Sequence, residues 1–270
     1  MGEAKRRTDR KRRILANHPL CCFCGGGEPA TTIDHAPART CFVRRVGPEG
    51  FEFPACKRCQ EASRRDELIF GFYIRTLDTD ERNYNSEDIS DLMRGMRNNA
   101  PEMLPELDLP PNAKRATLRE AGLTLERGQL LDDVPLVGVP VGFKDVVRMV
   151  TAKLACALHY KHLDAHIPVG HRLMIIFNQL QFPSGRELAE RLVEAMPDLV
   201  VGQRGNTNIG DQFAYVWGRN EDEDLFAIGA QFSQSMFILA AAAPPSTVAA
   251  ARTPEDWLPL HRWIDGAAPT

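Results

Sequence analysis

Six of the seven cysteines lie between residues 21 and 59, and four of them form two Cys-x-x-Cys pairs. The first pair is Cys21 and Cys24, and the second is Cys56 and Cys59. Two such turns supply the four thiolates that a tetrahedral Zn²⁺ site needs. An odd number of cysteines fits metal binding better than a disulfide framework. The spacing therefore predicts a structural zinc site, and the alternatives are a redox pair or unpaired buried thiols.

Of the remaining cysteines, Cys41 and Cys156 are expected to be packing residues, whereas Cys22 could replace Cys21 as a ligand only with the less usual Cys22-x-Cys24 spacing. Cys22 lies inside the first pair and Cys41 between the two pairs, while Cys156 falls in an apolar helical pattern. A thiol in such a setting behaves as a small hydrophobic side chain.

An Asp-His pair, Asp34-His35, lies between the two cysteine pairs. A carboxylate is a ligand for a hard cation, and a neutral imidazole can accept a proton near neutral pH. Adjacent residues of a strand point to opposite faces, so both can reach one phosphate only at a strand end or irregularity. The alternative interpretation is a hydrogen-bonded pair that supports the surrounding hairpin.

The order Cys-x-x-Cys, Asp-His-x-Pro, Pro-Ala-Cys-x-x-Cys over residues 18–68 resembles the HNH family of nucleases. The resemblance implies a zinc-stapled, treble-clef-like ββα module in which a hairpin and a helix hold one catalytic Mg²⁺ or Mn²⁺. It also implies that His35 is the general base and that Asp34 is a metal ligand. The family has Asn or His at or just beyond the position after the fourth cysteine, where this chain has Gln60 as the possible second ligand, followed by Glu61.

Basic residues surround this segment and predict a surface that binds nucleic-acid phosphates. Their planar guanidinium groups can donate two hydrogen bonds to one phosphate. The residues are Arg39, Arg44, Arg45, Lys57, Arg58, Arg64 and Arg65, together with a basic segment at residues 3–17. The alternative is an ordinary solvated face. We expect DNA rather than RNA as the partner, and no residue set predicts base specificity.

The charge of the chain is unevenly distributed. Residues 1–65 hold 14 Lys and Arg against seven Asp and Glu, whereas the other residues hold 19 against 29, for a total net charge of −3. Such an asymmetry suggests that only the first part meets a polyanion. We expect an HNH-like module in residues 1–78, a helical and proline-rich connection in 79–130, and a larger α+β domain in 131–270.

Periodicity predicts the elements of an α+β fold with an antiparallel sheet. Helices are expected at 3–17, 61–78, 86–98, 113–128, 143–163 and 185–194, and an extended segment at 131–142. Strands are expected at 172–178, 212–218, 224–231 and 235–241. The aromatic residues Phe213, Tyr215 and Trp217 should share one buried strand face, and Trp257 and Trp263 are expected to dock the C-terminal tail.

Four histidines, at positions 159, 162, 166 and 171, lie close together in the sequence. Helical spacing places neighbouring pairs on one face, which allows a metal site, but packed or surface histidines are the favoured interpretation.

These patterns together predict a metal-dependent endonuclease that cleaves nucleic-acid phosphodiester bonds. A second interpretation is a non-catalytic zinc module that binds nucleic acid or protein. A third places the function in the acidic C-terminal domain, which would select a target or a protein partner. No apolar run is long enough for a membrane span and no secretory signal is evident, so the chain is expected to be cytoplasmic.

Overall fold

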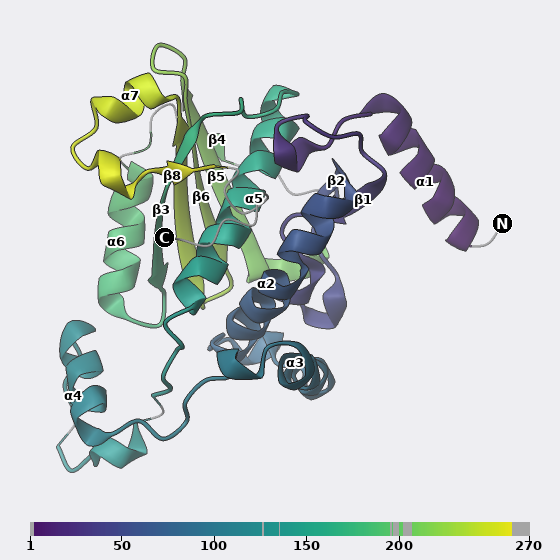
Figure 1. The fold of residues 1–270 in the computed structure, drawn as a ribbon. Helices are drawn as coiled ribbons and strands as arrows, with labels where there is room; N and C mark the ends of the chain where they lie inside the picture. The colour runs from purple at the N-terminus through teal and green to yellow at the C-terminus, as the bar shows by residue number, and fades with distance from the viewer. Residues whose placement is uncertain are drawn as a thin grey trace.

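The computed structural model describes residues 3–125, 127–134, 136–194, 196, 200–201 and 207–260. Its first part carries a long helix, a two-stranded hairpin and a second long helix (Figure 1). These elements are α1 (Glu3–Asn17), β1 (Thr32–His35), β2 (Glu52–Ala55) and α2 (Lys57–Thr76), with short 3₁₀ helices at Cys22–Cys24, Arg39–Cys41 and Val43–Arg45. Strands β1 and β2 are antiparallel, with Thr32 opposite Ala55 and His35 opposite Glu52.

Helices follow in the middle of the chain. They are α3 (Ser86–Asn99), α4 (Pro111–Glu120) and α5 (Phe143–Leu163), with 3₁₀ turns at Glu81–Asn83, Pro101–Met103 and Leu131–Asp133. Helix α3 packs along α2, whereas α4 lies apart from the rest of the chain (Figure 1). The bounds of α5 are those that the apolar periodicity predicts.

The C-terminal part forms a six-stranded sheet in the order β4-β5-β6-β7-β3-β8, in which every pairing is antiparallel. Its elements are β3 (Arg172–Gln179), α6 (Pro183–Glu194), β4 (Val200–Val201), β5 (Phe213–Asn220), β6 (Leu225–Phe232), β7 (Met236–Ala243), α7 (Pro245–Ala249) and β8 (Leu258–Pro259), with 3₁₀ turns at Thr207–Gln212 and Pro254–Asp256. The four expected strands are confirmed within about two residues. The short strands β4 and β8 are additions to the expected sheet.

Helices cover both faces of this sheet (Figure 1). Alternate residues of β6 and β7, such as Ile228 and Ile238, share a buried cluster with α5 on one face. Their neighbours, such as Ala227 and Leu239, pack on the other face in a cluster that includes residues of α6 and α7. Strand β7 is therefore buried along its whole length. Since side chains alternate across a strand, both faces must be apolar in such a central strand.

The helix expected at 113–128 is shorter than predicted, because it ends at Glu120. Gly122 follows with φ of 69°, a left-handed conformation that glycine adopts without steric cost. The amide of Leu123 donates to the carbonyl of Leu118, which is the bond of a Schellman cap. The segment at 131–142 was expected to be extended, but it begins with a 3₁₀ turn at Leu131–Asp133. Further along it, Gly138 forms an isolated antiparallel bridge with Glu106.

One buried cluster joins the N-terminal part to the sheet. The ring of Phe51 lies 5.7 Å from each of the rings of Phe213 and Tyr215, in edge-to-face geometry. Phe213 and Tyr215 are buried, as the alternation of aromatic residues along β5 predicts. Trp257 is buried as well, while the expected contact of Trp263 lies outside the described residues. None of the described helices has the length and apolar composition needed to cross a membrane.

Candidate functional site

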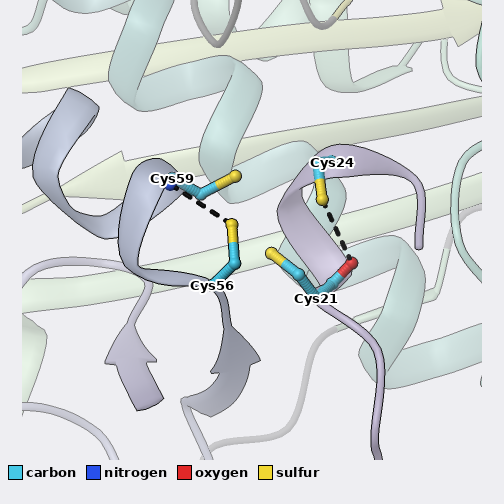
Figure 2. Close-up of side chains that lie close together, drawn as sticks. All are labelled: Cys21, Cys24, Cys56 and Cys59. Atoms are coloured by element: carbon cyan, nitrogen blue, oxygen red, sulfur yellow. Dashed lines mark hydrogen bonds between the residues drawn. The ribbon is translucent and has the colours of Figure 1, made fainter. Parts of the chain in front are cut away.

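The four predicted cysteines come together in the structure. Cys21 and Cys24 flank the first 3₁₀ turn, whereas Cys56 and Cys59 lie at the start of α2, and all four are buried. Their sulfur atoms lie within 4.8 Å of one another, and Figure 2 shows the two pairs facing each other. This is the one group of potential metal-ligating side chains found among the described residues.

Local backbone geometry shapes both turns. Gly25 and Gly26 follow the first pair with φ of 64° and 79°, which an L side chain adopts only with strain. The amide of Gly26 donates to the carbonyl of Cys21, closing a tight turn. In the second turn the amide of Cys59 donates to the sulfur of Cys56 at 3.4 Å (Figure 2). An amide directed at a sulfur stabilises its thiolate form.

The donor set fits a tetrahedral metal ion such as zinc. Four sulfurs at the ordinary Zn–S distance lie about 3.8 Å from one another, which is compatible with the observed cluster. Hydrogen bonds from Cys21 and Cys59 lower the pKa of Cys24 to about 3, and hydrogen bonds within the cluster raise the pKa of Cys59. Sulfurs this close cannot all be ionised unless a cation lies between them. The cluster can therefore hold a metal ion.

The three other cysteines are buried and lie outside this group. Burial raises the pKa of the Cys22, Cys41 and Cys156 thiols. They are consequently neutral packing residues at physiological pH, as the sequence context of Cys41 and Cys156 suggests, and Cys22 does not replace Cys21 in the group.

His35 lies at the end of β1, opposite Glu52. Its Nε2 is 3.3 Å from Oε1 of Glu52, and the other carboxylate oxygen of Glu52 is 2.7 Å from Nε of Arg10. Burial lowers the pKa of His35, and the positive charge of Arg39 lowers it further, whereas Glu52 acts in the opposite direction. The imidazole is therefore neutral at neutral pH, as a proton acceptor must be.

Asp34 is engaged through both of its carboxylate oxygens. Its Oδ1 accepts a hydrogen bond from the amide of His35 at 2.8 Å, and its Oδ2 lies 2.5 Å from Nζ of Lys153. Lys153 belongs to α5, and its ammonium group also donates to Ser63 and Glu67 of α2. Asp34 is thus paired with a buried lysine that is distant in the sequence.

Gln60 makes a hydrogen bond to the backbone of β1 and does not line the cleft that Asp34 and His35 line. Its Nε2 donates to the carbonyl of Ile33 at 3.3 Å, which ties the start of α2 to β1. The next residue, Glu61, is exposed and lies 3.7 Å from Lys57. With both oxygens of Asp34 occupied as well, these residues do not fit the Mg²⁺ or Mn²⁺ ion that the resemblance implies. The expected divalent cation on Asp34 and Gln60 thus has no support in the structure.

A cleft of about 820 Å³ opens beside these residues, between the hairpin, α2 and α3. Asp34 and His35 line it, together with four of the predicted phosphate-binding residues, Arg39, Arg45, Arg64 and Arg65. Among the described residues, Arg44, Lys57 and Arg58 do not contribute to its lining. Acidic and amide side chains line it too, namely Glu61, Glu67, Asp91 and Asn99. The sequence interpretation did not include the contributions of Glu67 and of α3.

Arg45, which lines the cleft, and its neighbour Arg44 have an unusual backbone. Arg44 and Arg45 have φ of 53° and 54°, in the left-handed region that non-glycine residues rarely adopt. The amide of Arg44 donates to Asp88 and that of Val43 to Gln212, so the surrounding structure holds this conformation. Strain of this kind costs on the order of 1–3 kcal/mol per residue and tends to occur at functional sites.

The four histidines of the second candidate cluster make separate packing contacts. His159 bonds the carbonyl of Ala165, His162 lies 3.1 Å from the hydroxyl of Tyr215, and His171 lies 3.2 Å from Asp224. His166 packs against the ring of Tyr160. These separate contacts do not converge on one point, and none of the four belongs to a metal-ligating group of the described residues, in agreement with the favoured sequence interpretation.

Comparison with known proteins finds no match: no family model, no curated protein and no solved structure is similar to this chain.

Proposed function

We propose that the protein binds the backbone of a nucleic acid in the cleft and hydrolyses a phosphodiester bond there, with His35 as general base. In this proposal Zn²⁺ on the four cysteines is a purely structural part of a treble-clef-like ββα module. The observation that carries the proposal is the position of His35, at the end of β1, in a cleft that four arginines line. Arginine forks bind phosphate oxygens, and a neutral imidazole accepts the proton of an attacking water molecule.

The contact between His35 and Glu52 supports a defined role for each ring nitrogen. In this proposal the proton lies on Nε2, which is 3.3 Å from Oε1 of Glu52 in an ion-pair contact without hydrogen-bond geometry. That tautomer leaves Nδ1 with a free lone pair, so Nδ1 is the basic nitrogen in this proposal. Arg10, which lies against the other oxygen of Glu52, holds the carboxylate in place. Glu52 is therefore a positioning residue.

The arginines bind the phosphate and stabilise the charge that develops on it. Arg39 and Arg45 lie on the hairpin side of the cleft, and Arg64 and Arg65 on α2. A phosphodiester group between these two walls would meet positive charge from both sides. Phosphate contacts of this kind bind without base specificity, and we propose DNA as the preferred substrate.

A second candidate function is binding without cleavage. The specific observation in its favour is the pairing of Asp34 with Lys153, together with the hydrogen bond from Gln60 to the backbone. The lysine occupies one carboxylate oxygen that a divalent ion would use, and the hydrogen bond ties the Gln60 side chain to β1. The same module would then present its arginines to a nucleic acid as a docking surface only.

One set of variants separates the two candidates. Labelled DNA and RNA are incubated with the native protein and with His35→Ala, and both cleavage and equilibrium binding are measured. A loss of cleavage of about 100-fold or more with unchanged binding supports His35 as a general base. Equal binding with no cleavage in either sample supports the docking surface.

The phosphate-binding role is tested with the double variant Arg64→Ala, Arg65→Ala. If each arginine contacts one phosphate, the slope of log K against log salt concentration falls by about two. Arg119→Ala on α4 is the matched control, because Arg119 is an exposed arginine outside the cleft lining. Equal loss of binding in this control, or no loss in the double variant, would overturn both candidate functions.

A further inference from the structure

A buried ammonium group lies behind the wall of the cleft. Lys153 is 1% exposed, in the middle of α5, and its Nζ donates to three oxygen atoms. These are Oδ2 of Asp34 at 2.5 Å, Oγ of Ser63 at 2.8 Å and Oε1 of Glu67. An ammonium group has three N–H donors, so all of them are used. The ring of Phe23 closes the group off, with its centroid 5.0 Å from Nζ.

The carboxylates require a cation at this position. Asp34 and Glu67 are buried to a large extent and both point to the same Nζ. Two carboxylates that share a site cannot both remain ionised unless a positive charge lies between them. Burial by itself would lower the pKa of Lys153, but Glu67 and Asp34 outweigh it, and the pKa of Lys153 is raised. The lysine is therefore charged, and it is bound in place.

Two carboxylates and a hydroxyl directed at one point are also the kind of ligands that Mg²⁺ or Mn²⁺ takes. The ammonium group fills that point. We propose that the ammonium group of Lys153 occupies the position of a divalent metal ion and holds Asp34 and Glu67 in place. The cleft then binds nucleic-acid phosphates without Mg²⁺ or Mn²⁺. The part of this inference that concerns nucleic acid depends on the proposed function, whereas the exclusion of a metal ion does not.

The replacement changes what the site can do. A divalent ion would offer open coordination positions to a phosphate oxygen or a water molecule. The ammonium group offers none, because its three protons are already donated within the protein. It supplies positive charge and fixes Asp34 and Glu67, while direct contact with phosphate is left to the arginines of the cleft.

The first test uses the native protein and Mn²⁺ alone. Binding of Mn²⁺ is followed by electron paramagnetic resonance in the zinc-loaded protein and in Asp34→Asn. We expect no stoichiometric Mn²⁺ site in either sample. A site of one equivalent in the native protein that is lost in Asp34→Asn would overturn the proposal. No nucleic acid is present, so this result is independent of the proposed function.

The second test removes the ammonium group. Lys153→Ala frees both carboxylates and leaves space between them, so we expect one new Mn²⁺ site, which the double variant Lys153→Ala, Asp34→Asn lacks. Circular dichroism checks that each variant is folded. A folded Lys153→Ala protein without a new site would contradict the proposal, and if that variant does not fold, the native measurement decides.

A third measurement concerns the nucleic acid. Binding of labelled DNA to the native protein is compared in Mg²⁺ at a few millimolar and after brief treatment with EDTA at equal ionic strength. We expect affinities within about twofold of each other, since the cationic groups belong to the chain. A loss of tenfold or more on chelation, with the zinc content unchanged, would show that a divalent ion takes part. Failure to bind DNA under both conditions contradicts the proposed function and the part of this inference that rests on it, while the Mn²⁺ result stands.

Discussion

His35 lies between two charged groups that shift its pKa in opposite directions. Burial and the positive charge of Arg39 lower the pKa, whereas the negative charge of Glu52 raises it. His35 and Arg39 approach the same carboxylate oxygen: Nε2 of His35 lies 3.3 Å, and a guanidinium nitrogen of Arg39 3.8 Å, from Oε1 of Glu52. The fraction of neutral imidazole at a given pH therefore depends on both residues.

We predict opposite shifts for two isosteric or near-isosteric changes. Glu52→Gln removes the negative charge and should lower the pKa of His35, so the imidazole stays neutral to more acidic pH. Arg39→Gln removes the positive charge and should raise the pKa of His35. Titration of the His35 ring by NMR measures both, and the acid limb of any rate–pH profile should move in the same directions. Shifts of the same sign in the two variants would contradict this electrostatic account.

The candidate site could be predicted from the sequence only where its residues are close in the chain. The cysteine turns and Asp34-His35 are local patterns, and the spacing was enough to find them. Lys153 is separated from Asp34 by 119 positions, and no local pattern connects them. A signal was nevertheless present: Lys153 stands beside Leu154 within an apolar helix, and a lysine at such a position requires a buried partner.

At the scale of elements, the packing of the 3₁₀ helix Arg39–Cys41 on α2 depends on one glycine. A Cβ atom on Gly71 would lie 2.6 Å from both Cβ and Oγ1 of Thr40 and 2.8 Å from its backbone carbonyl carbon. The hydroxyl of Thr40 donates to the carbonyl of Glu67, so the two segments are also hydrogen-bonded. This contact places Arg39 at the rim of the cleft, which makes Gly71 a support for the site.

We predict that Gly71→Ala lowers the free energy of unfolding by about 1–3 kcal/mol, because the backbone of Thr40 must move. The helix propensity of alanine offsets only about 1 kcal/mol of this cost. Gly95→Ala on α3 is the matched control: its Cβ would meet the end of the flexible Leu68 side chain at 3.1 Å. Urea unfolding should show a loss for Gly71→Ala and a change near zero for Gly95→Ala. Equal effects in the two variants would show that close packing at Thr40 is not the cause.

Element types were also predictable where a pattern is long and local. The helix at 143–163 and the four longer strands follow from periodicity alone. The helix expected at 113–128 ends at Glu120 because Gly122 adopts a left-handed conformation that stops it. The two short strands at the edges of the sheet carry too few residues for a pattern, and only tertiary pairing defines them.

At the scale of the whole molecule, the cysteine module and the sheet share one buried cluster. The four cysteines belong to the same cluster as residues of α5 and of the inner face of the sheet. Phe42 and Phe51 of the hairpin region contact Phe213 of β5. These contacts join residues about 160 positions apart, and the sequence suggested only a division into separate regions. A continuous core couples the stability of the metal site to that of the sheet.

We therefore predict that loss of the metal ion destabilises the whole chain and not the N-terminal module alone. Binding of Zn²⁺ to four cysteines contributes directly to folding, so Cys59→Ser should lower the stability by about 5 kcal/mol or more. For a chain of this size that corresponds to a fall in Tm of about 10–20 °C.

Cys156→Ala is the matched control, since Cys156 is buried but does not belong to the group of four cysteines. This substitution should lower the stability by only about 1–2 kcal/mol. Calorimetry should show one transition that moves as a unit in Cys59→Ser, with less than half an equivalent of zinc retained. An unchanged transition for the sheet, accompanied by a separate early transition for the N-terminal module, would mean that the shared core does not transmit the loss. The aromatic contacts between hairpin and β5 would then be too weak to couple the two parts.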